Sequence, residues 1–192
     1  MIKKVIVAKN IGFCFGVQKA IDIARKYAPE GISSLGSIIH NRAVVKDLEQ
    51  KGLKTVKSID EITSAKVIIR SHGEGKAVYE ALEKKGIEIF DATCPFVKKI
   101  HRIVQKYYSQ GYQIIIAGIK THSEVIGING WCDNTAIIIN SHENIPHIES
   151  DKICVVAQTT FSVKEFERIT KYFNNLNQKS VVVFNTICYT TN

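Results

Sequence analysis

The sequence predicts an α/β protein built from repeated lobes, each with a small and mostly parallel sheet. Short apolar runs alternate with amphipathic helical patterns along the chain, as in parallel sheets whose strands are joined by helices. The order cysteine, helix, glycine, strand and histidine also occurs twice. His40 lies 26 residues after Cys14, and His122 lies 28 residues after Cys94. This self-similarity indicates a duplicated unit.

The first unit is delimited by residues that start and stop helices. Asn41 is a residue type that caps helix N-termini and Gly52 one that ends helices, which predicts a helix between them. The other elements expected here are, in order, an N-terminal strand over residues 4–8, a helix over 17–26, an apolar segment over 32–39, a strand over 67–69, a helix over 76–85 and a strand over 87–90.

The second unit begins with a long amphipathic helix over residues 95–110. Pro95 suits the first helical position, where its missing N–H is no loss, and Gly111 ends the pattern. The run over residues 112–117 is almost continuously apolar, which predicts a strand buried on both faces. The remaining elements are expected to be strands over 136–139 and 153–156, a helix over 162–174 and a strand over 180–184.

Composition limits the classes of function. The 192 residues carry a formal charge of +8, which favours an anionic partner, either nucleic acid or a phosphorylated small molecule. Basic residues are interleaved with acidic ones and form no nucleic-acid motif, so we expect no nucleic-acid partner. No apolar run is long enough for a signal peptide or a membrane span, so a cytoplasmic protein without membrane association is expected. Its five cysteines are then expected to be reduced thiols or metal ligands.

Chemically reactive side chains follow the predicted strands. In parallel sheets, ligands bind beyond the carboxyl ends of the strands, so side chains placed there should converge. Cys94 also precedes a helix N-terminus, which should favour its thiolate form. The side chains expected to meet are Cys14, His40, His72, Cys94, His122, Thr159 and Cys188.

Three separated cysteines suggest an iron–sulfur cluster more than structural zinc. Structural zinc sites usually have pairs of cysteines two to four residues apart, and none occur here. A four-iron cluster held by three thiolates leaves one iron without a protein ligand, where substrate can bind. Three imidazoles could bind phosphate. Glu124 could be an acid of that site or a solvated surface residue. Structural roles are assigned to Cys132, Cys154, His101, His142 and His147.

Taken together, these motifs closely resemble those of the 4-hydroxy-3-methylbut-2-enyl diphosphate reductase family, and the resemblance covers essentially the whole chain. The matching segments are Gly12-Phe13-Cys14-Phe15-Gly16-Val17, Asp91-Ala92-Thr93-Cys94-Pro95 with His101, His122-Ser123-Glu124, Gln158-Thr159-Thr160 and Asn185-Thr186-Ile187-Cys188. Each motif alone is weak, but their order and spacing are specific.

The resemblance implies a two-electron reductive dehydroxylation. The family converts (E)-4-hydroxy-3-methylbut-2-enyl diphosphate to isopentenyl and dimethylallyl diphosphate, the last step of the methylerythritol phosphate route to isoprenoids, with electrons from ferredoxin or flavodoxin. By resemblance, the ligands of a [4Fe-4S] cluster are Cys14, Cys94 and Cys188, the proton-delivering acid is Glu124, the hydroxyl near that of the substrate is Thr159, and the diphosphate-binding imidazoles are His40, His72 and His122.

The resemblance also implies three lobes arranged in pseudo-threefold fashion around the cluster. Family members continue past the third cysteine into a lobe that carries a Ser-x-Asn substrate motif, whereas this sequence stops at Asn192. We therefore expect the third lobe to be missing, and an inactive two-lobed protein, with or without cluster, is the alternative to an active reductase. The expected divisions are 1–12 (a strand of the missing lobe), 13–94 (first lobe), 95–188 (second lobe) and 189–192 (start of the third lobe).

Overall fold

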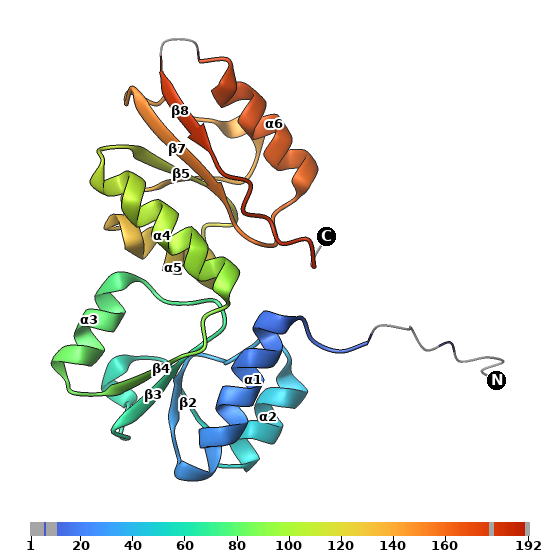
Figure 1. The fold of residues 1–192 in the computed structure, drawn as a ribbon, viewed down its shortest axis with the longest axis vertical. Coiled ribbons are helices and arrows are strands. Elements are labelled where there is room, and N and C mark those ends of the chain that lie inside the picture. Colours follow the sequence, from blue (N-terminus) through green and yellow to red (C-terminus); the bar gives the residue numbers. More distant parts are fainter. Residues whose placement is uncertain (1–5, 7–10, 177–178, 191–192) are drawn as a thin grey trace.

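The computed structural model describes residues 6, 11–176 and 179–190, which form two four-stranded sheets (Figure 1). In the first sheet the strand order is β2-β1-β3-β4, and in the second it is β6-β5-β7-β8. All strand pairs in these two sheets are parallel. The strands are β1 (Ser33–Leu35), β2 (Lys54–Val56), β3 (Lys66–Ile69), β4 (Glu88–Asp91), β5 (Gln113–Ala117), β6 (Ile137–Ile139), β7 (Lys152–Ala157) and β8 (Ser180–Val183).

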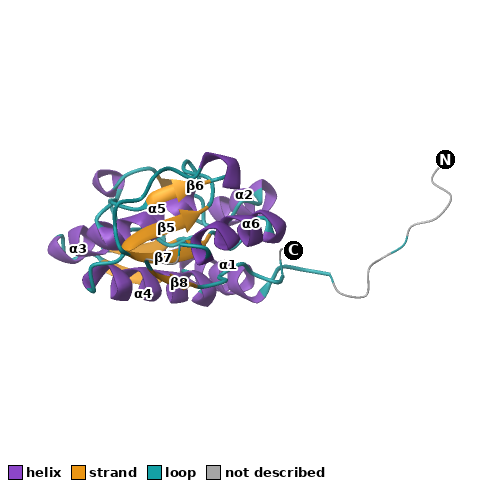
Figure 2. Cartoon of the chain, turned by 90° about the horizontal axis from the view of Figure 1, so that it is seen from above, coloured by secondary structure: helices purple, strands orange, loops and turns teal. Residues whose placement is uncertain are grey.

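Helices connect these strands and cover both faces of each sheet. In the view of Figure 1 the first sheet lies below the second, and the N-terminal ends of α1 and α4 lie near the junction between them. Figure 2 shows the helices around the strands from above. The helices are α1 (Phe15–Tyr27), α2 (Arg42–Gln50), α3 (Lys76–Lys84), α4 (Pro95–Ser109), α5 (Ser123–Asn129) and α6 (Val163–Asn174). None of the described helices is both long and apolar enough to cross a lipid bilayer.

The predicted duplication is confirmed at the level of individual residues. Leu35 pairs with Ile69 at the end of the first sheet, and Ala117 pairs with Ala157 at the same place in the second. The glycine that follows each central strand donates its N–H to the neighbouring edge strand, from Gly36 to a β2 carbonyl and from Gly118 to a β6 carbonyl. Equivalent positions are therefore 82 residues apart at the ends of β1 and β5, and 88 residues apart at the ends of β3 and β7.

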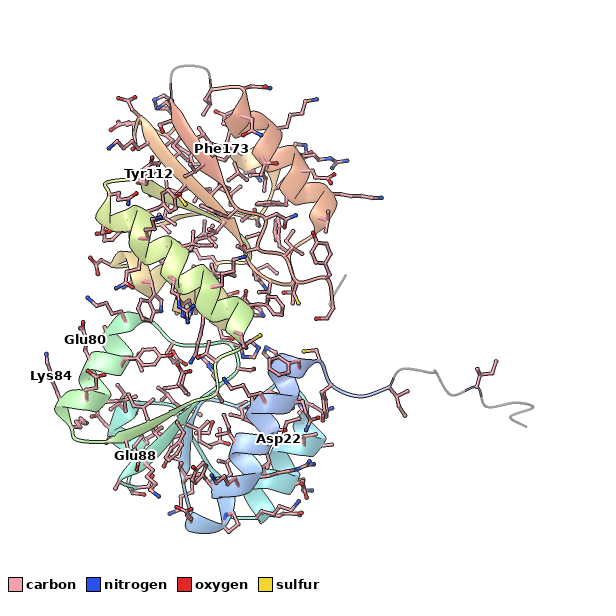
Figure 3. The ribbon with its side chains drawn as sticks, viewed as in Figure 1. Asp22, Glu80, Lys84, Glu88, Tyr112 and Phe173 are labelled. Carbon is pink, nitrogen blue, oxygen red and sulfur yellow. The ribbon has the colours of Figure 1, made fainter. Side chains whose placement is uncertain are left out.

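Alternating side chains of the central strands divide each lobe into two apolar layers. Ile68 packs with α1 and α2, whereas its neighbours in β3 pack against α3. In the second lobe Ile115 packs with α6, and Ile116 packs with α4 and α5. Phe173 is fully buried on α6, while Asp22, Glu80, Lys84 and Glu88 are exposed (Figure 3). Burial on both faces of β5 confirms the prediction from its apolar run.

Several element boundaries differ from the sequence prediction. α1 begins directly after Cys14 rather than at Val17. The apolar segment 32–39 forms a strand only at its start, because Gly36 has a φ of 73° and turns the chain. β2 and α5 were not predicted, since β2 has two exposed residues of three and α5 is a single seven-residue helix. The strand expected over 4–8 lies outside the described residues except for Ile6.

Candidate functional site

The strand order explains why the predicted residues meet. In a sheet of order β2-β1-β3-β4, the connections leave β1 and β3 in opposite directions, which opens a crevice beyond their carboxyl ends. His40 follows β1 and His72 follows β3 in the first lobe. His122 follows β5 and Thr159 follows β7 in the second lobe. Each lobe thus places two polar side chains at its own crevice.

A cavity of about 140 Å³ joins these crevices. Its walls come from both lobes and include every residue singled out from the sequence as a site residue. These are Cys14, His40, His72, Cys94, His122, Glu124, Thr159 and Cys188. The structure therefore brings the whole predicted set together.

Two of the three thiols reach the cavity from helix N-caps, and two are held by equivalent backbone hydrogen bonds. Cys14 is the N-cap of α1, and Cys94 is the N-cap of α4, with Pro95 at the first helical position as predicted. Cys188 follows β8, and its N–H donates to the carbonyl of Thr159 at 2.8 Å. The corresponding bond in the first lobe runs from Cys94 N–H to the carbonyl of Ser71 at 3.0 Å. Cys94 and Cys188 are thus held by the duplicated scaffold in the same way.

A glycine allows α1 to approach Cys94. A Cβ atom placed on Gly16 would overlap the Cys94 sulfur, so any larger residue would push the thiol from its position. Gly16 lies two residues after Cys14, and the same short segment therefore provides one thiol and leaves room for another. The sequence indicated this glycine only as part of a motif.

The predicted stabilisation of the Cys94 thiolate is outweighed in the structure. Burial raises the pKa of Cys94, although the N–H groups of Phe96 and Val97 at the helix N-terminus lower it in part. The neighbouring thiols of Cys14 and Cys188 raise it further. The helix N-terminus does favour the thiolate as predicted, but the prediction left out desolvation and the mutual repulsion of three thiolates, which outweigh it. A cationic metal group would reverse this balance.

The donor set fits an iron–sulfur cluster better than a single metal ion. Within the described residues, no three histidine, cysteine or carboxylate side chains are close enough to hold one ion. The thiols of Cys14, Cys94 and Cys188 instead line one cavity together. Thiolates are the ligands of iron–sulfur clusters, which span several ångströms, and the space left by Gly16 lets one of them face the cavity.

The three histidines form a compact group beside the thiols. The ring centres of His40 and His72 are 4.3 Å apart, and each lies 5.8 Å from that of His122. Burial, reinforced by His40, Arg70 and His122, lowers the pKa of His72 to about 3. Burial and the charges of His40 and Arg70 also lower the pKa of His122. His72 is therefore neutral near pH 7 and can offer a phosphate oxygen one N–H.

Glu124 and Thr159 form a buried hydrogen-bonded pair. Thr159 donates its backbone N–H to Glu124 Oε1 and its hydroxyl to Oε2, both at 2.6 Å. Only 2% of Glu124 is exposed, and burial raises its pKa despite these two donors. The sequence left open whether Glu124 is solvated, and the structure shows that it is buried at the cavity. It lies in the first turn of α5, where its N–H donates to the ring of His122, the N-cap.

Further residues line the cavity that were not selected as site residues from the sequence. Ser71 donates its hydroxyl to the carbonyl of Ile38 at 3.1 Å and occupies the position equivalent to Thr159. That equivalence was the signal that could have found it, because each residue lies two positions beyond a paired strand end. The other added lining residues are Val17, Phe96, Val97, Thr160 and Thr190.

The residues given structural roles do not line this cavity. Cys132 and Cys154 are fully buried in the second lobe, where burial raises the pKa of the first to about 11 and that of the second to about 12. His101 stacks on Trp131 with ring centres 5.2 Å apart. His142 contacts Glu165 at 2.6 Å. The cysteines and histidines selected from the sequence thus line the cavity, whereas the other two cysteines and three histidines lie elsewhere.

Comparisons with known proteins place this chain in a family. The LytB protein family matches residues 5–192. A 4-hydroxy-3-methylbut-2-enyl diphosphate reductase of Caldanaerobacter subterraneus is 47% identical over 98% of this chain, which spans 68% of that relative.

Solved structures agree with this assignment. The E-1-hydroxy-2-methyl-but-2-enyl-4-diphosphate reductase of Plasmodium falciparum is 29% identical with a TM-score of 0.84, and the match covers 95% of this chain and 60% of the other. A structure of (E)-4-hydroxy-3-methyl-but-2-enyl diphosphate reductase, described as the terminal enzyme of the non-mevalonate pathway, is 37% identical with a TM-score of 0.81 over 96% of this chain and 68% of the other. The chain spans about two thirds of the length of these relatives, and it belongs to the LytB protein family.

Proposed function

We propose that this chain provides the cluster-binding and substrate-binding lobes of a 4-hydroxy-3-methylbut-2-enyl diphosphate reductase. The observation that carries the proposal is the convergence of three thiols, three imidazoles and a protonatable carboxyl on one cavity. The reaction would replace the allylic hydroxyl of the substrate by hydrogen, using two electrons and two protons and releasing water. We place the two lobes at residues 13–94 and 95–188, on either side of Cys94.

In this proposal Cys14, Cys94 and Cys188 hold a [4Fe-4S] cluster. When bound, the cluster supplies electrons and, at the iron without a protein ligand, a Lewis acid for the substrate hydroxyl. Family resemblance indicates ferredoxin or flavodoxin as the electron donor. The thiols must be deprotonated to bind the cluster, so cluster binding should release protons, including that of Cys94, which its raised pKa keeps protonated beforehand.

The imidazoles would bind the diphosphate of the substrate. His40, His72 and His122 lie within one 6 Å group at the carboxyl ends of three strands. The Nδ1 atom of His72 is buried and has no hydrogen-bond partner in the described part of the chain. Buried polar atoms usually have partners, and a phosphate oxygen in the cavity would provide one for this ring.

Glu124 would deliver a proton to the reacting carbon or oxygen. Burial favours the protonated acid, and Thr159 fixes the orientation of the carboxyl by bonding both of its oxygens. A general acid is most effective when its pKa lies near the working pH, and a raised pKa moves Glu124 in that direction. Thr159 thus fixes the place of the acid at the cavity, while burial favours its protonated form.

Anaerobic purification followed by a turnover assay tests the proposal. We expect a brown protein with iron and sulfide in roughly equal amounts, and consumption of the diphosphate substrate when dithionite and a mediator are added. An intact cluster without turnover would support the alternative of an inactive two-lobed protein. A protein that cannot be loaded with iron and sulfide would contradict the assignment of the three thiols.

A further inference from the structure

Arg70 occupies the same structural position in the first lobe as Gln158 in the second. Arg70 follows Ile69, the last residue of β3 that pairs with β1. Gln158 likewise follows Ala157, the last residue of β7 that pairs with β5. Each side chain also packs on the glycine that ends the central strand. A Cβ on Gly36 would contact the Arg70 guanidinium at 2.6 Å, and one on Gly118 would meet Gln158 at 3.1 Å. The second lobe therefore fills this position with a neutral amide, whereas the first uses a cation.

The guanidinium of Arg70 is held in a mostly buried ion pair. Its Nη2 lies 2.8 Å from Glu74 Oε1, with 22% of the arginine side chain and 12% of the glutamate side chain exposed. Glu74 is fixed in turn, since its carbonyl accepts a hydrogen bond from Trp131 Nε1 at 3.0 Å. The Nε of Arg70 is buried and lacks a hydrogen-bond partner among the described residues. The pair is thus anchored to the second lobe with one donor unused.

Arg70 lies at the carboxyl ends of β1 and β3, because it directly follows β3, two residues before His72, and its guanidinium packs on Gly36, four residues before His40. The charge of Arg70 contributes to the lowered pKa values of both His72 and His122. A buried diphosphate carries several negative charges that must be balanced. His72 is held neutral by burial, so it contributes a hydrogen bond but no full charge. A cation that cannot lose its proton is therefore needed close by.

We propose that Arg70 is the fixed cation of the diphosphate site, acting through its electric field on the bound anion and held in place by Glu74 and Gly36. This inference rests on the proposed function, because it requires that the histidine group binds a diphosphate. Arg70 is a positioning and charge-setting residue rather than a catalytic one. The ion pair partly offsets its charge, so Glu74 tunes how strongly the anion is attracted.

Isothermal titration calorimetry with inorganic pyrophosphate, at pH 7.5 and low salt on the anaerobically purified chain, tests the inference. R70Q places the residue of the equivalent position of the second lobe into the first, and should therefore fill the same space. We expect R70Q to weaken pyrophosphate binding by about tenfold, as the loss of one nearby charge at intermediate dielectric implies. R70K should retain most of the affinity. R168Q, which removes a mostly exposed arginine of α6, should bind like the wild type.

E74Q separates an electrostatic role from a structural one. Both R70Q and E74Q break the same ion pair and should lower the thermal stability. An electrostatic role predicts opposite effects on affinity, with tighter pyrophosphate binding in E74Q because the arginine charge is no longer offset. Weaker binding in both variants, or unchanged binding in R70Q while the wild type binds, would overturn this inference alone. If the wild type binds no pyrophosphate, the proposed diphosphate site fails, and the inference fails with it.

Discussion

Helices α2 and α5 occupy equivalent places in the two lobes but contribute different chemistry. Each begins just after a histidine that follows the central strand, His40 before α2 and His122 before α5. Two residues beyond these histidines, the first lobe has exposed Arg42 and the second has buried Glu124. The duplicated backbone thus provides the same imidazole twice, and a single side chain in one copy adds the acid. The duplication therefore determines where these side chains lie, whereas the residue type and its burial determine whether the position holds an exposed cation or a buried acid.

The largest effect is expected from replacing one of the thiols, because both lobes contribute them and all three are needed to hold the cluster. Replacing Cys14 with Ser should abolish cluster binding, because a serine hydroxyl does not replace a thiolate as a soft ligand. Iron and sulfide analysis and the visible spectrum of the reconstituted protein measure this. C154S is the matched control, since Cys154 is buried in the second core away from the cavity. It should lose about 1–3 kcal/mol of stability for burying a hydroxyl, but keep its iron. Equal iron loss in both variants would contradict the assignment.

Glu124→Gln tests whether only the second lobe provides a proton-delivering residue at this position. The amide keeps the size and can still accept from Thr159, but it cannot deliver a proton. We expect turnover to fall by about 10²–10⁴-fold with the cluster spectrum unchanged. Arg42→Gln changes the equivalent position of the first lobe and should leave turnover close to that of the wild type. A comparable loss in both variants would mean that the two positions act alike.

Thr159→Val should shift the pH dependence of kcat to higher pH. The threonine donors lower the pKa of Glu124 against the effect of burial, so removing the hydroxyl should raise that pKa further. If the reaction needs the protonated acid, activity is lost as pH rises through its pKa, and the basic limb of the kcat profile should move to higher pH. Ser71→Ala, at the equivalent position, should leave that limb in place. A shift to lower pH in T159V would contradict the acid role of Glu124.

The smallest effect is expected between the lobes, at His101. Burial lowers its pKa to about 4, whereas the unfolded chain takes up this proton near pH 6.5. Between these values the unfolded state binds more protons, so stability falls as pH decreases from 6.5 towards 4, by about 3 kcal/mol for this group. Urea unfolding of H101F at pH 7 and pH 4.5 should show a weaker loss on acidification than the wild type. H147Q, at an exposed histidine, should keep the wild-type dependence.

Much of the site could be predicted because chemistry and strand ends coincide in the sequence. His40 and His122 follow apolar segments in matching order, and parallel sheets gather such residues at one edge. The helix α5 could not be found this way, since it has only seven residues and contains Gly127, so periodicity gives little signal. The burial of Glu124 depended on that helix and was left open for the same reason.

By itself, the sequence determined the duplicated α/β plan and the identity of the thiols, imidazoles and hydroxyl that meet. These follow from local patterns, namely apolar runs, helix signals and residue types at strand ends. Only the tertiary structure decided their electrostatic state. The raised pKa of Cys94 and the neutral ring of His72 depend on desolvation and on charges from distant segments. Such effects arise only when the two lobes enclose one cavity, because burial is a property of the packed molecule rather than of any stretch of chain.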